Sequence, residues 1–212
     1  DAGGAGFSIR PERIDEQVHT RTKPLRLGVV LDRPVERAAV SMKIEPVRLE
    51  ELVPAGSLPA NGGFEAGALG WDLGGNGMGS VVDTQAAVGK RALRILDESK
   101  TVGSNIYSPA MPVQARSAYR VTGKAMHRSG GGLGIYVRFR DANGHRIDAP
   151  RKDGHLGALD STGGAWHDFA FSFISPDGAA SMRLWLHSYN AARVDVLLDE
   201  LKVLPERERM EP

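Results

Sequence analysis

The sequence predicts an all-β fold built as a sandwich of two antiparallel sheets, such as a jelly roll. Glycine accounts for 26 of the 212 residues and proline for 12, which indicates many turns. From residue 61 onward, short apolar runs of period two alternate with turn sequences such as Asp-Ala-Asn-Gly at 141–144 and Pro-Asp-Gly at 176–178. About eight such runs, without a long helical pattern, are typical of a sandwich.

The first 58 residues are predicted to form a separate β segment. Strands are expected at residues 7–14, 25–31 and 38–49, and the second of these alternates cleanly between Leu25 and Leu31. Because Phe7 is its single aromatic residue, the segment would bury little core on its own. Two interpretations stay open: an extra layer on the main domain, or the tail of a neighbouring module.

Residues 59–206 are predicted to form the sandwich, with residues 207–212 as a tail. Strands are expected, in chain order, at residues 80–83, 92–96, 105–111, 118–127, 132–141, 167–174, 182–189 and 193–203. Their apolar positions alternate with polar ones. One side of each strand should therefore face the core, and the other should face solvent or a ligand.

The composition narrows the range of functions. With 27 basic and 26 acidic residues the net charge is +1, which argues against non-specific binding of nucleic acid. The absence of cysteine excludes a disulfide scaffold and a thiolate metal site. No apolar run approaches the roughly 18 residues of a membrane span, and the six histidines lack zinc-site spacing.

An ordered set of short motifs runs through residues 61–204. It opens with Asn-Gly-Gly-Phe-Glu at 61–65, continues through residues 89–95 and 137–144, and closes with Leu-Asp-Glu-Leu at 198–201. This order resembles the carbohydrate-binding modules of families four, nine, sixteen and twenty-two. The resemblance implies a jelly-roll, galactose-binding-like sandwich. It also implies a module appended to a secreted or cell-surface bacterial enzyme that degrades polysaccharide.

The outward positions of three predicted strands combine aromatic and cationic side chains. Sugar rings stack on aromatic planes, and their hydroxyls need polar partners. Arginine also suits carboxylate or sulfate groups, so an anionic polymer is a candidate ligand. If the strands share one sheet, we expect stacking on Trp185 and Tyr136, with the cations as polar partners. The candidate ligand residues are Lys124, Tyr136, Arg138, Arg140, Arg183, Trp185 and His187.

Other aromatic residues are assigned mainly to packing. Trp71 and Trp166 lie at the ends of turns, and Tyr107 and Tyr189 lie near strand ends, where contacts with the rim of a ligand are also conceivable. These four residues are therefore not counted among the candidate ligand residues.

Two other functions are also compatible with the sequence. A spacer module without sugar affinity would result if the strands of residues 25–49 covered the outward face. A polysaccharide lyase would use a tyrosine or histidine base and an arginine to neutralise a uronate. Tyr136, Arg138, Arg140 and His187 could supply these groups. The lyase strand motifs, the nucleophile elbow and the phosphate loop are all absent from the sequence. We therefore expect a non-catalytic module that holds a neighbouring catalytic domain near its polysaccharide.

The resemblance also implies a structural calcium ion. Glu65 matches the acid of the opening motif, Asp199 matches the first acid of the closing motif, and the carbonyl of Lys90 lies where a backbone ligand is usual. Calcium takes about six to eight oxygens from carboxylates and carbonyls. Such an ion would tie the first strand to the last. The alternative is that both acids lie at the surface or bond to backbone groups.

Overall fold

The computed structural model describes residues 6–13, 25–39, 58–189 and 192–206, and its contacts divide the chain into Asp1–Pro46 and Val47–Pro212. In the first unit, β1 (Phe7–Arg13) pairs antiparallel with β2 (Leu25–Leu31). Both strands were expected. The third expected strand, at residues 38–49, falls almost entirely outside the described residues.

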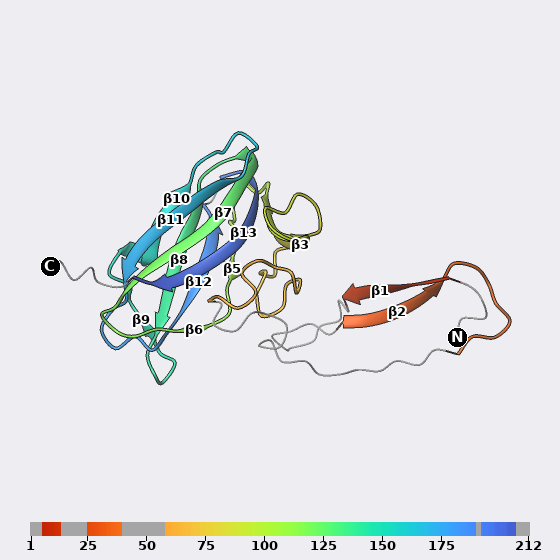
Figure 1. Ribbon diagram of the computed structural model, residues 1–212, viewed down its shortest axis with the longest axis horizontal. Coiled ribbons are helices and arrows are strands. Elements are labelled where there is room, and N and C mark those ends of the chain that lie inside the picture. The colour runs from red at the N-terminus through yellow and green to blue at the C-terminus, as the bar shows by residue number, and fades with distance from the viewer. Residues whose placement is uncertain (1–5, 14–24, 40–57, 190–191, 207–212) are drawn as a thin grey trace. The chain divides into compact units, whose positions relative to one another are not determined.

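The second unit is a sandwich of two antiparallel sheets (Figure 1). The six-stranded sheet runs in the order β10-β8-β12-β5, with β9 beside β8 and β6 beside β12. Its strands are β5 (Ile106–Tyr107), β6 (Met111–Pro112), β8 (Leu133–Arg140), β9 (Arg146–Ile147), β10 (His155–Leu159) and β12 (Ser181–Ser188).

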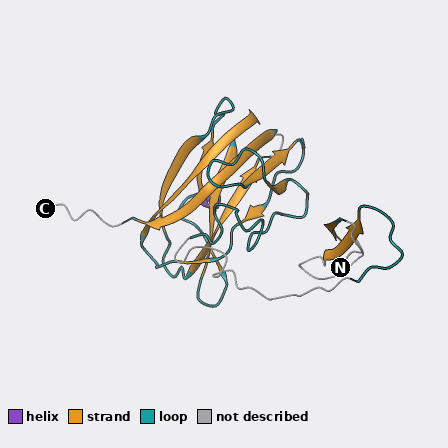
Figure 2. Ribbon diagram, turned by 45° about the vertical axis from the view of Figure 1, so that its right-hand side comes forward, coloured by secondary structure: helices purple, strands orange, loops and turns teal. Residues whose placement is uncertain are grey.

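The second sheet of the sandwich has five strands in the order β11-β7-β13-β4-β3. They are β3 (Gly79–Val82), β4 (Ala92–Asp97), β7 (Ala118–Gly130), β11 (His167–Ile174) and β13 (Val194–Pro205). A single turn of 3₁₀ helix, η1 (Lys152–Gly154), precedes β10. Strands make up nearly all the regular structure of the described residues (Figure 2), which confirms the all-β prediction.

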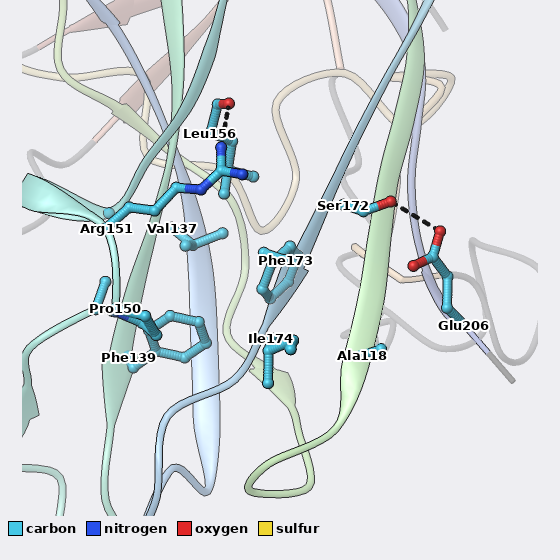
Figure 3. Close-up of a pocket in the computed structure, with 12 residues that line it drawn as sticks. Ala118, Val137, Phe139, Pro150, Arg151, Leu156, Ser172, Phe173, Ile174 and Glu206 are labelled. Carbon is cyan, nitrogen blue, oxygen red and sulfur yellow. Dashed lines mark hydrogen bonds between the residues drawn. The ribbon is translucent and has the colours of Figure 1, made fainter. Parts of the chain in front are cut away.

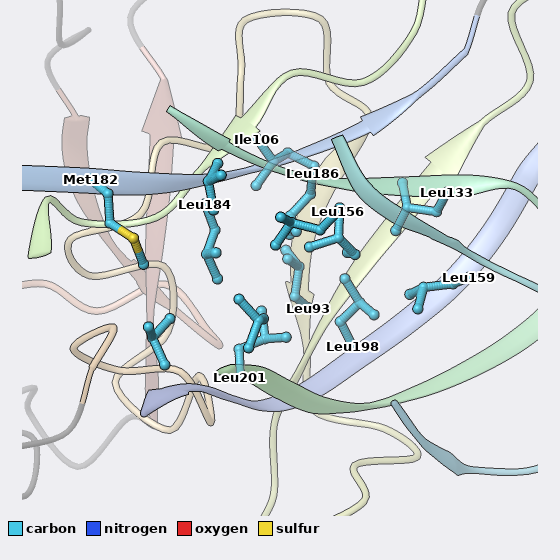
Figure 4. Close-up of a cluster of buried hydrophobic side chains, with 14 of the residues drawn as sticks. Leu93, Ile106, Leu133, Leu156, Leu159, Met182, Leu184, Leu186, Leu198 and Leu201 are labelled. Atoms are coloured by element: carbon cyan, nitrogen blue, oxygen red, sulfur yellow. The ribbon is translucent and has the colours of Figure 1, made fainter. Parts of the chain in front are cut away.

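The side chains that point inward from each strand form the core between the two sheets. Leu93 of β4 and Leu184 and Leu186 of β12 are fully buried there (Figure 4). Ile95 of β4 and Ile135 of β8 are fully buried as well. The period-two alternation predicted this phase because every second side chain of a strand points to the same face.

The Asn-Gly-Gly-Phe-Glu motif closes the sandwich. The Asn61 side chain accepts a hydrogen bond from the Ala66 amide (3.1 Å) and donates one to the Gly67 carbonyl (2.9 Å). Phe64 is fully buried against Trp71, with 4.9 Å between their ring centroids. The carbonyl of Gly62 accepts a hydrogen bond from the Leu201 amide (3.0 Å) and so joins the start of the sandwich to β13. Trp71 therefore has the packing role expected of it.

The strand prediction was wrong in several details. The expected strand at residues 105–111 is two short strands, β5 and β6, which both pair with β12. The strand β10 was not expected, because Gly157 interrupts its short apolar pattern. A Cβ atom at Gly157 would lie 2.2 Å from Cε1 of Phe171, so glycine lets β10 and the ring of β11 approach closely.

Candidate functional site

The pairing of β8 with β12 brings most of the candidate ligand residues together. Trp185 lies opposite Tyr136 on β8 and opposite Tyr107 on β5, and Arg183 lies opposite Arg138. Paired positions of an antiparallel sheet project to the same face. Six of the seven candidates therefore share the outer face of the six-stranded sheet, namely Tyr136, Arg138, Arg140, Arg183, Trp185 and His187.

The seventh candidate, Lys124, does not belong to this face. It lies on β7, which pairs with β11 and β13 in the other sheet, and its Nζ is 2.7 Å from Oδ1 of Asp168. Gly130 and Gly132, both at positive φ, lie where the chain turns between β7 and β8. Consecutive strands thus enter different sheets, and the assumption that they share one was wrong.

Six aromatic rings form a continuous cluster on the outer face of the six-stranded sheet. Neighbouring ring centroids are between 4.5 and 6.4 Å apart, within the range of favourable aromatic contact. We call this group the aromatic cluster. Its members are Tyr107, Tyr136, His155, Trp185, His187 and Tyr189.

Tyr136 forms the floor of the aromatic cluster. Its side chain is 2% exposed, because the rings of Trp185 and His155 lie 4.6 and 4.8 Å from it. Burial raises the pKa of the Tyr136 hydroxyl well above its ordinary value, and the adjacent Tyr189 hydroxyl adds to this effect. Tyr136 was expected to stack against a sugar. The structure instead leaves it no ring face for a ligand.

Trp185 is half-buried and held on several sides. The guanidinium carbon of Arg138 lies 4.1 Å from the centroid of the indole, a cation–π contact. The His187 ring stacks on the indole at 4.5 Å with 25° between the planes. The strand register places Arg138 and His187 on opposite sides of Trp185 along β12. The indole Nε1 donates a 3.1 Å hydrogen bond to Oδ1 of Asn105, which fixes the ring orientation.

A buried network positions His187. Nδ1 of His187 donates to the carbonyl of Ser104, because a carbonyl oxygen can only accept. In the neutral imidazole, Nε2 is then left as an acceptor. Two hydrogen bonds hold Ser104 to Ser188: the Ser104 amide donates to Oγ of Ser188 (2.7 Å), and the Ser188 amide donates to Oγ of Ser104 (2.9 Å). The Ser188 hydroxyl donates in turn to Asp97 of the opposite sheet. The packed interior therefore sets the position of this ring.

Sequence reasoning did not select four residues of this site. Tyr107 and Tyr189 had been assigned mainly to packing near strand ends, yet both belong to the aromatic cluster. His155 was missed because it opens the unexpected strand β10. Asn105 had been placed at the start of the expected strand at 105–111, but it lies in the loop before β5. Trp166, by contrast, is half-buried in the loop before β11.

The three residues of the expected calcium site do lie together. Oε1 of Glu65 accepts hydrogen bonds from the amides of Lys90 (2.8 Å) and Arg91 (2.9 Å). Oδ2 of Asp199 accepts from the amides of Ala87 and Val88, both at 2.9 Å. Two carboxylates, from the start and the end of the sandwich, thus hold one loop at residues 87–91. This is the backbone bonding that the alternative interpretation had anticipated.

The two carboxylates differ in their protonation behaviour. The amides of Lys90 and Arg91 hold the pKa of Glu65 below its ordinary value. Asp199 is fully buried, and burial raises its pKa although the amides of Val88, Glu200 and Ala87 oppose the shift. Among the described residues, no group of three or more His, Cys, Asp or Glu side chains could hold a metal ion. An ion here would depend on two carboxylates and on backbone carbonyls, which are oxygen ligands that calcium accepts.

An apolar cavity of about 470 Å³ lies between the sheets, where β8 faces β11. Phe139, Phe173 and Ile174 point into it (Figure 3). The polar groups at its rim are engaged within the chain: Arg151 donates to the Leu156 carbonyl, and Glu206 accepts from Ser172. The cavity contains none of the aromatic cluster and is an opening of the core.

The sequence of the chain is similar to that of a known protein family. A family model described as a carbohydrate binding domain, CBM_4_9, matches residues 56–192, more than half of the chain. The chain belongs to this family of carbohydrate binding domains. The predictions of a carbohydrate-binding module and of a non-catalytic role are thereby confirmed. A search of curated proteins gives no match.

Solved structures of carbohydrate-binding modules share the fold of the chain. The CBM22-1 xylan-binding domain from Paenibacillus barcinonensis Xyn10C is 22% identical with a TM-score of 0.50, over 64% of this chain and 85% of that one. The C-terminal family 22 module of Clostridium thermocellum Xyn10B is 15% identical with a TM-score of 0.52, over 72% and 98%. No helix among the described residues is long and apolar enough to cross a membrane.

Proposed function

We propose that this carbohydrate-binding module holds its glycan on the outer face of the six-stranded sheet, across the aromatic cluster. The observation that carries the proposal is the cluster itself, because it presents several aromatic rings beside polar groups on one side of the sandwich. Tyr189 is 48% exposed, and Trp185 and Tyr107 are half-buried. These three rings are the ones that a sugar can contact.

The polar partners of the glycan follow from the same geometry. Nε2 of His187 is an acceptor for a sugar hydroxyl, since Nδ1 is committed to Ser104. Arg183 is exposed beside Trp185 and offers donors. The guanidinium of Arg138 covers one side of the indole, so a sugar that stacks there must displace it. The displaced guanidinium can then donate a hydrogen bond to the sugar.

The biological setting that we propose is a secreted or cell-surface bacterial protein. One similar structure, a module at 16% identity, comes from the CBM22-1-GH10 modules of Clostridium thermocellum Xyn10B complexed with xylohexaose. That arrangement supports the idea that this module also directs a neighbouring catalytic domain to its polysaccharide.

We further propose that calcium binds between Glu65, Asp199 and the carbonyl of Lys90. Oε2 of Glu65 and the Lys90 carbonyl accept no hydrogen bond from the described residues, so both are open to a cation. The ion would reinforce the contact of both carboxylates with the loop at 87–91. Its role would be structural, because this loop belongs with the five-stranded sheet and not with the aromatic cluster.

The substitution Trp185→Ala tests the proposed face. Affinity electrophoresis in gels that contain soluble xylans and β-glucans should show retardation of the native protein by at least one polymer. We expect Trp185→Ala to weaken that binding by at least about tenfold, the size typical of a buried aromatic anchor in an interface.

The matched control is Leu204→Ala, which removes an exposed apolar side chain from β13 in the other sheet. This control should be retarded like the native protein. Equal retardation of Trp185→Ala and the native protein would place the ligand elsewhere. A folded protein that no polymer retards would favour the spacer function.

A further inference from the structure

Four arginines gather on the outer face of the six-stranded sheet beside the aromatic cluster. Arg138 lies opposite Arg183, and Arg140 lies opposite Arg146 of β9. Arg138 and Arg140 are two residues apart on β8, so all four side chains project to the same face. We call this group the arginine surface.

No carboxylate in the described part of the chain neutralises the charges of the arginine surface. None of these four guanidinium groups forms an ion pair with a carboxylate of the described residues. Arg138 donates to the backbone carbonyl of Asp153 at 3.0 Å, and Arg140 donates to the carbonyl of Gly144. Like charges that face each other across a sheet are destabilising. This arrangement therefore costs stability that no carboxylate of the described residues offsets.

The other sheet treats its cations differently. Arg94 and Arg128 both approach Asp195, at 2.9 and 3.6 Å, and Lys124 is paired with Asp168. The chain thus provides carboxylates for these three cations, which lie away from the aromatic cluster. The lack of such partners on the arginine surface indicates a place for an external anion.

A hollow of about 260 Å³ lies at the edge of the arginine surface, between β8, β9 and η1. Arg138, Arg146, Arg151 and Lys152 line it, against two acids, Asp148 and Asp153. Basic side chains therefore outnumber acidic ones in its lining. Because the guanidinium of Arg138 also lies over Trp185, the hollow begins beside the indole of the aromatic cluster.

We propose that the arginine surface is an anion subsite, and that the preferred ligand is an acidic polysaccharide with carboxylate or sulfate groups. This inference rests on the proposed function of the aromatic cluster. A neutral sugar unit would contact Trp185, and an acidic group on the same chain would enter the hollow near Arg138 and Arg146. Arginine presents donors in a planar fork that matches carboxylate and sulfate oxygens.

The test compares two forms of one polymer. Binding is measured by affinity electrophoresis and calorimetry with a glucuronic-acid-substituted xylan and with the same xylan after its carboxyl groups are reduced to alcohols. A second pair, dextran sulfate and dextran, replaces carboxylate with sulfate. We expect the acidic form of at least one pair to bind more tightly than its neutral form by about fivefold or more. The difference should shrink as salt rises from about 50 mM to about 0.5 M, since screening lengths fall.

Variants locate the effect. Arg146→Gln and Arg183→Gln each remove one charge, and we expect each to lower affinity for the acidic form by roughly threefold to tenfold. Arg146→Gln should leave affinity for the neutral form nearly unchanged, whereas Arg183→Gln should lower it as well, because Arg183 also donates to the sugar in the proposed function. The matched control is Arg120→Gln, an exposed arginine on β7 of the other sheet, which should alter neither affinity. Thermal unfolding confirms that each variant is folded.

The outcomes separate the two proposals. Equal binding of acidic and neutral forms, with Trp185→Ala still abolishing both, would overturn the anion subsite and leave the proposed function in place. The same conclusion would follow if Arg120→Gln weakened acidic binding as much as Arg146→Gln did. A folded protein that binds no member of either pair, and none of the neutral polymers, would overturn both proposals.

Discussion

His127 is a buried histidine whose ring finds no hydrogen-bond partner in the described part of the chain. It lies on the inward phase of β7 with 1% of its surface exposed, and neither ring nitrogen is satisfied by the described residues. Its backbone amide donates to Oγ1 of Thr162 at 2.8 Å. Burial lowers the pKa of His127, although the charge of Asp160 opposes the shift. A buried polar group without a partner generally costs about 1–3 kcal/mol.

We predict that His127 makes the fold sensitive to acid. A histidine whose pKa is lowered by folding contributes its stability above the unfolded pKa, about 6.5, and loses it as pH falls through the folded value. The variant His127→Leu should be more stable than the native protein, by an amount that grows as pH falls below about 6.5. Urea unfolding between about pH 8 and pH 5 measures this difference.

The control for this prediction is His167→Gln, since His167 is exposed at the start of β11. Its pH profile should follow that of the native protein. Parallel pH profiles for His127→Leu and the native protein would show that His127 does not carry the effect.

Tyr136 shows how far a single residue can be predicted. Alternation along β8 correctly assigned it to the outer face, because that depends on neighbouring residues alone. Its burial depends on rings from three other places in the chain: Trp185, His155 and Tyr189. One of these comes from a strand that the sequence pattern did not reveal. Side-chain direction was therefore predictable, and exposure was not.

At the scale of elements, Gly62 marks the contact between the start of the sandwich and its last strand. A Cβ atom at this position would lie 2.0 Å from the carbonyl oxygen of Leu201, which is backbone and cannot turn aside. The opening motif therefore needs glycine for close approach. The resemblance that suggested the fold rests in part on this contact.

We predict that Gly62→Ala destabilises the protein by about 1–3 kcal/mol, as overpacking does. The matched control is Gly75→Ala, because a Cβ atom at Gly75 would have no other group within 4 Å. Denaturant unfolding of both variants measures the difference. Similar denaturation midpoints for the two variants would mean that the backbone at Leu201 shifts at little cost to accommodate the added methyl group.

The strands themselves were predictable in proportion to their length and alternation. The long strands β7, β8, β11, β12 and β13 were all expected, because each carries several alternating apolar residues. β9 and β10 were not expected. β9 has two residues, and β10 contains a glycine that packs under Phe171. Which strands share a sheet could not be read from alternation, and the placement of Lys124 was wrong for that reason.

At the scale of the whole molecule, Asp199 and Glu65 connect the two ends of the sandwich, and calcium is expected to strengthen the connection. Without the ion, the raised pKa of Asp199 means that its contribution to stability is fully present below about pH 3.9 and is lost as pH rises through the folded value. Calcium requires the charged carboxylate, so it should reverse this trend.

We predict that calcium about a hundredfold above its Kd stabilises the native protein by roughly 2–3 kcal/mol, and that Asp199→Asn abolishes the effect. Unfolding is compared with added calcium and with chelator across pH. Asp177→Asn, at an exposed pair with Arg116, is the control and should respond to calcium as the native protein does. Identical stability with calcium and with chelator would contradict a calcium site.

The contact between Leu58 and β13 joins the start of the described sandwich to its last strand. The carbonyl of Leu58 accepts a hydrogen bond from the Val203 amide, two residues before β13 ends at Pro205. Leu58 and Val203 are therefore separated by about one strand spacing, roughly 5 Å. Both lie at the five-stranded sheet, while the aromatic cluster lies on the other one. Residues near both ends of the described sandwich thus lie close together, a geometry that allows a domain to be inserted into a loop of a host protein.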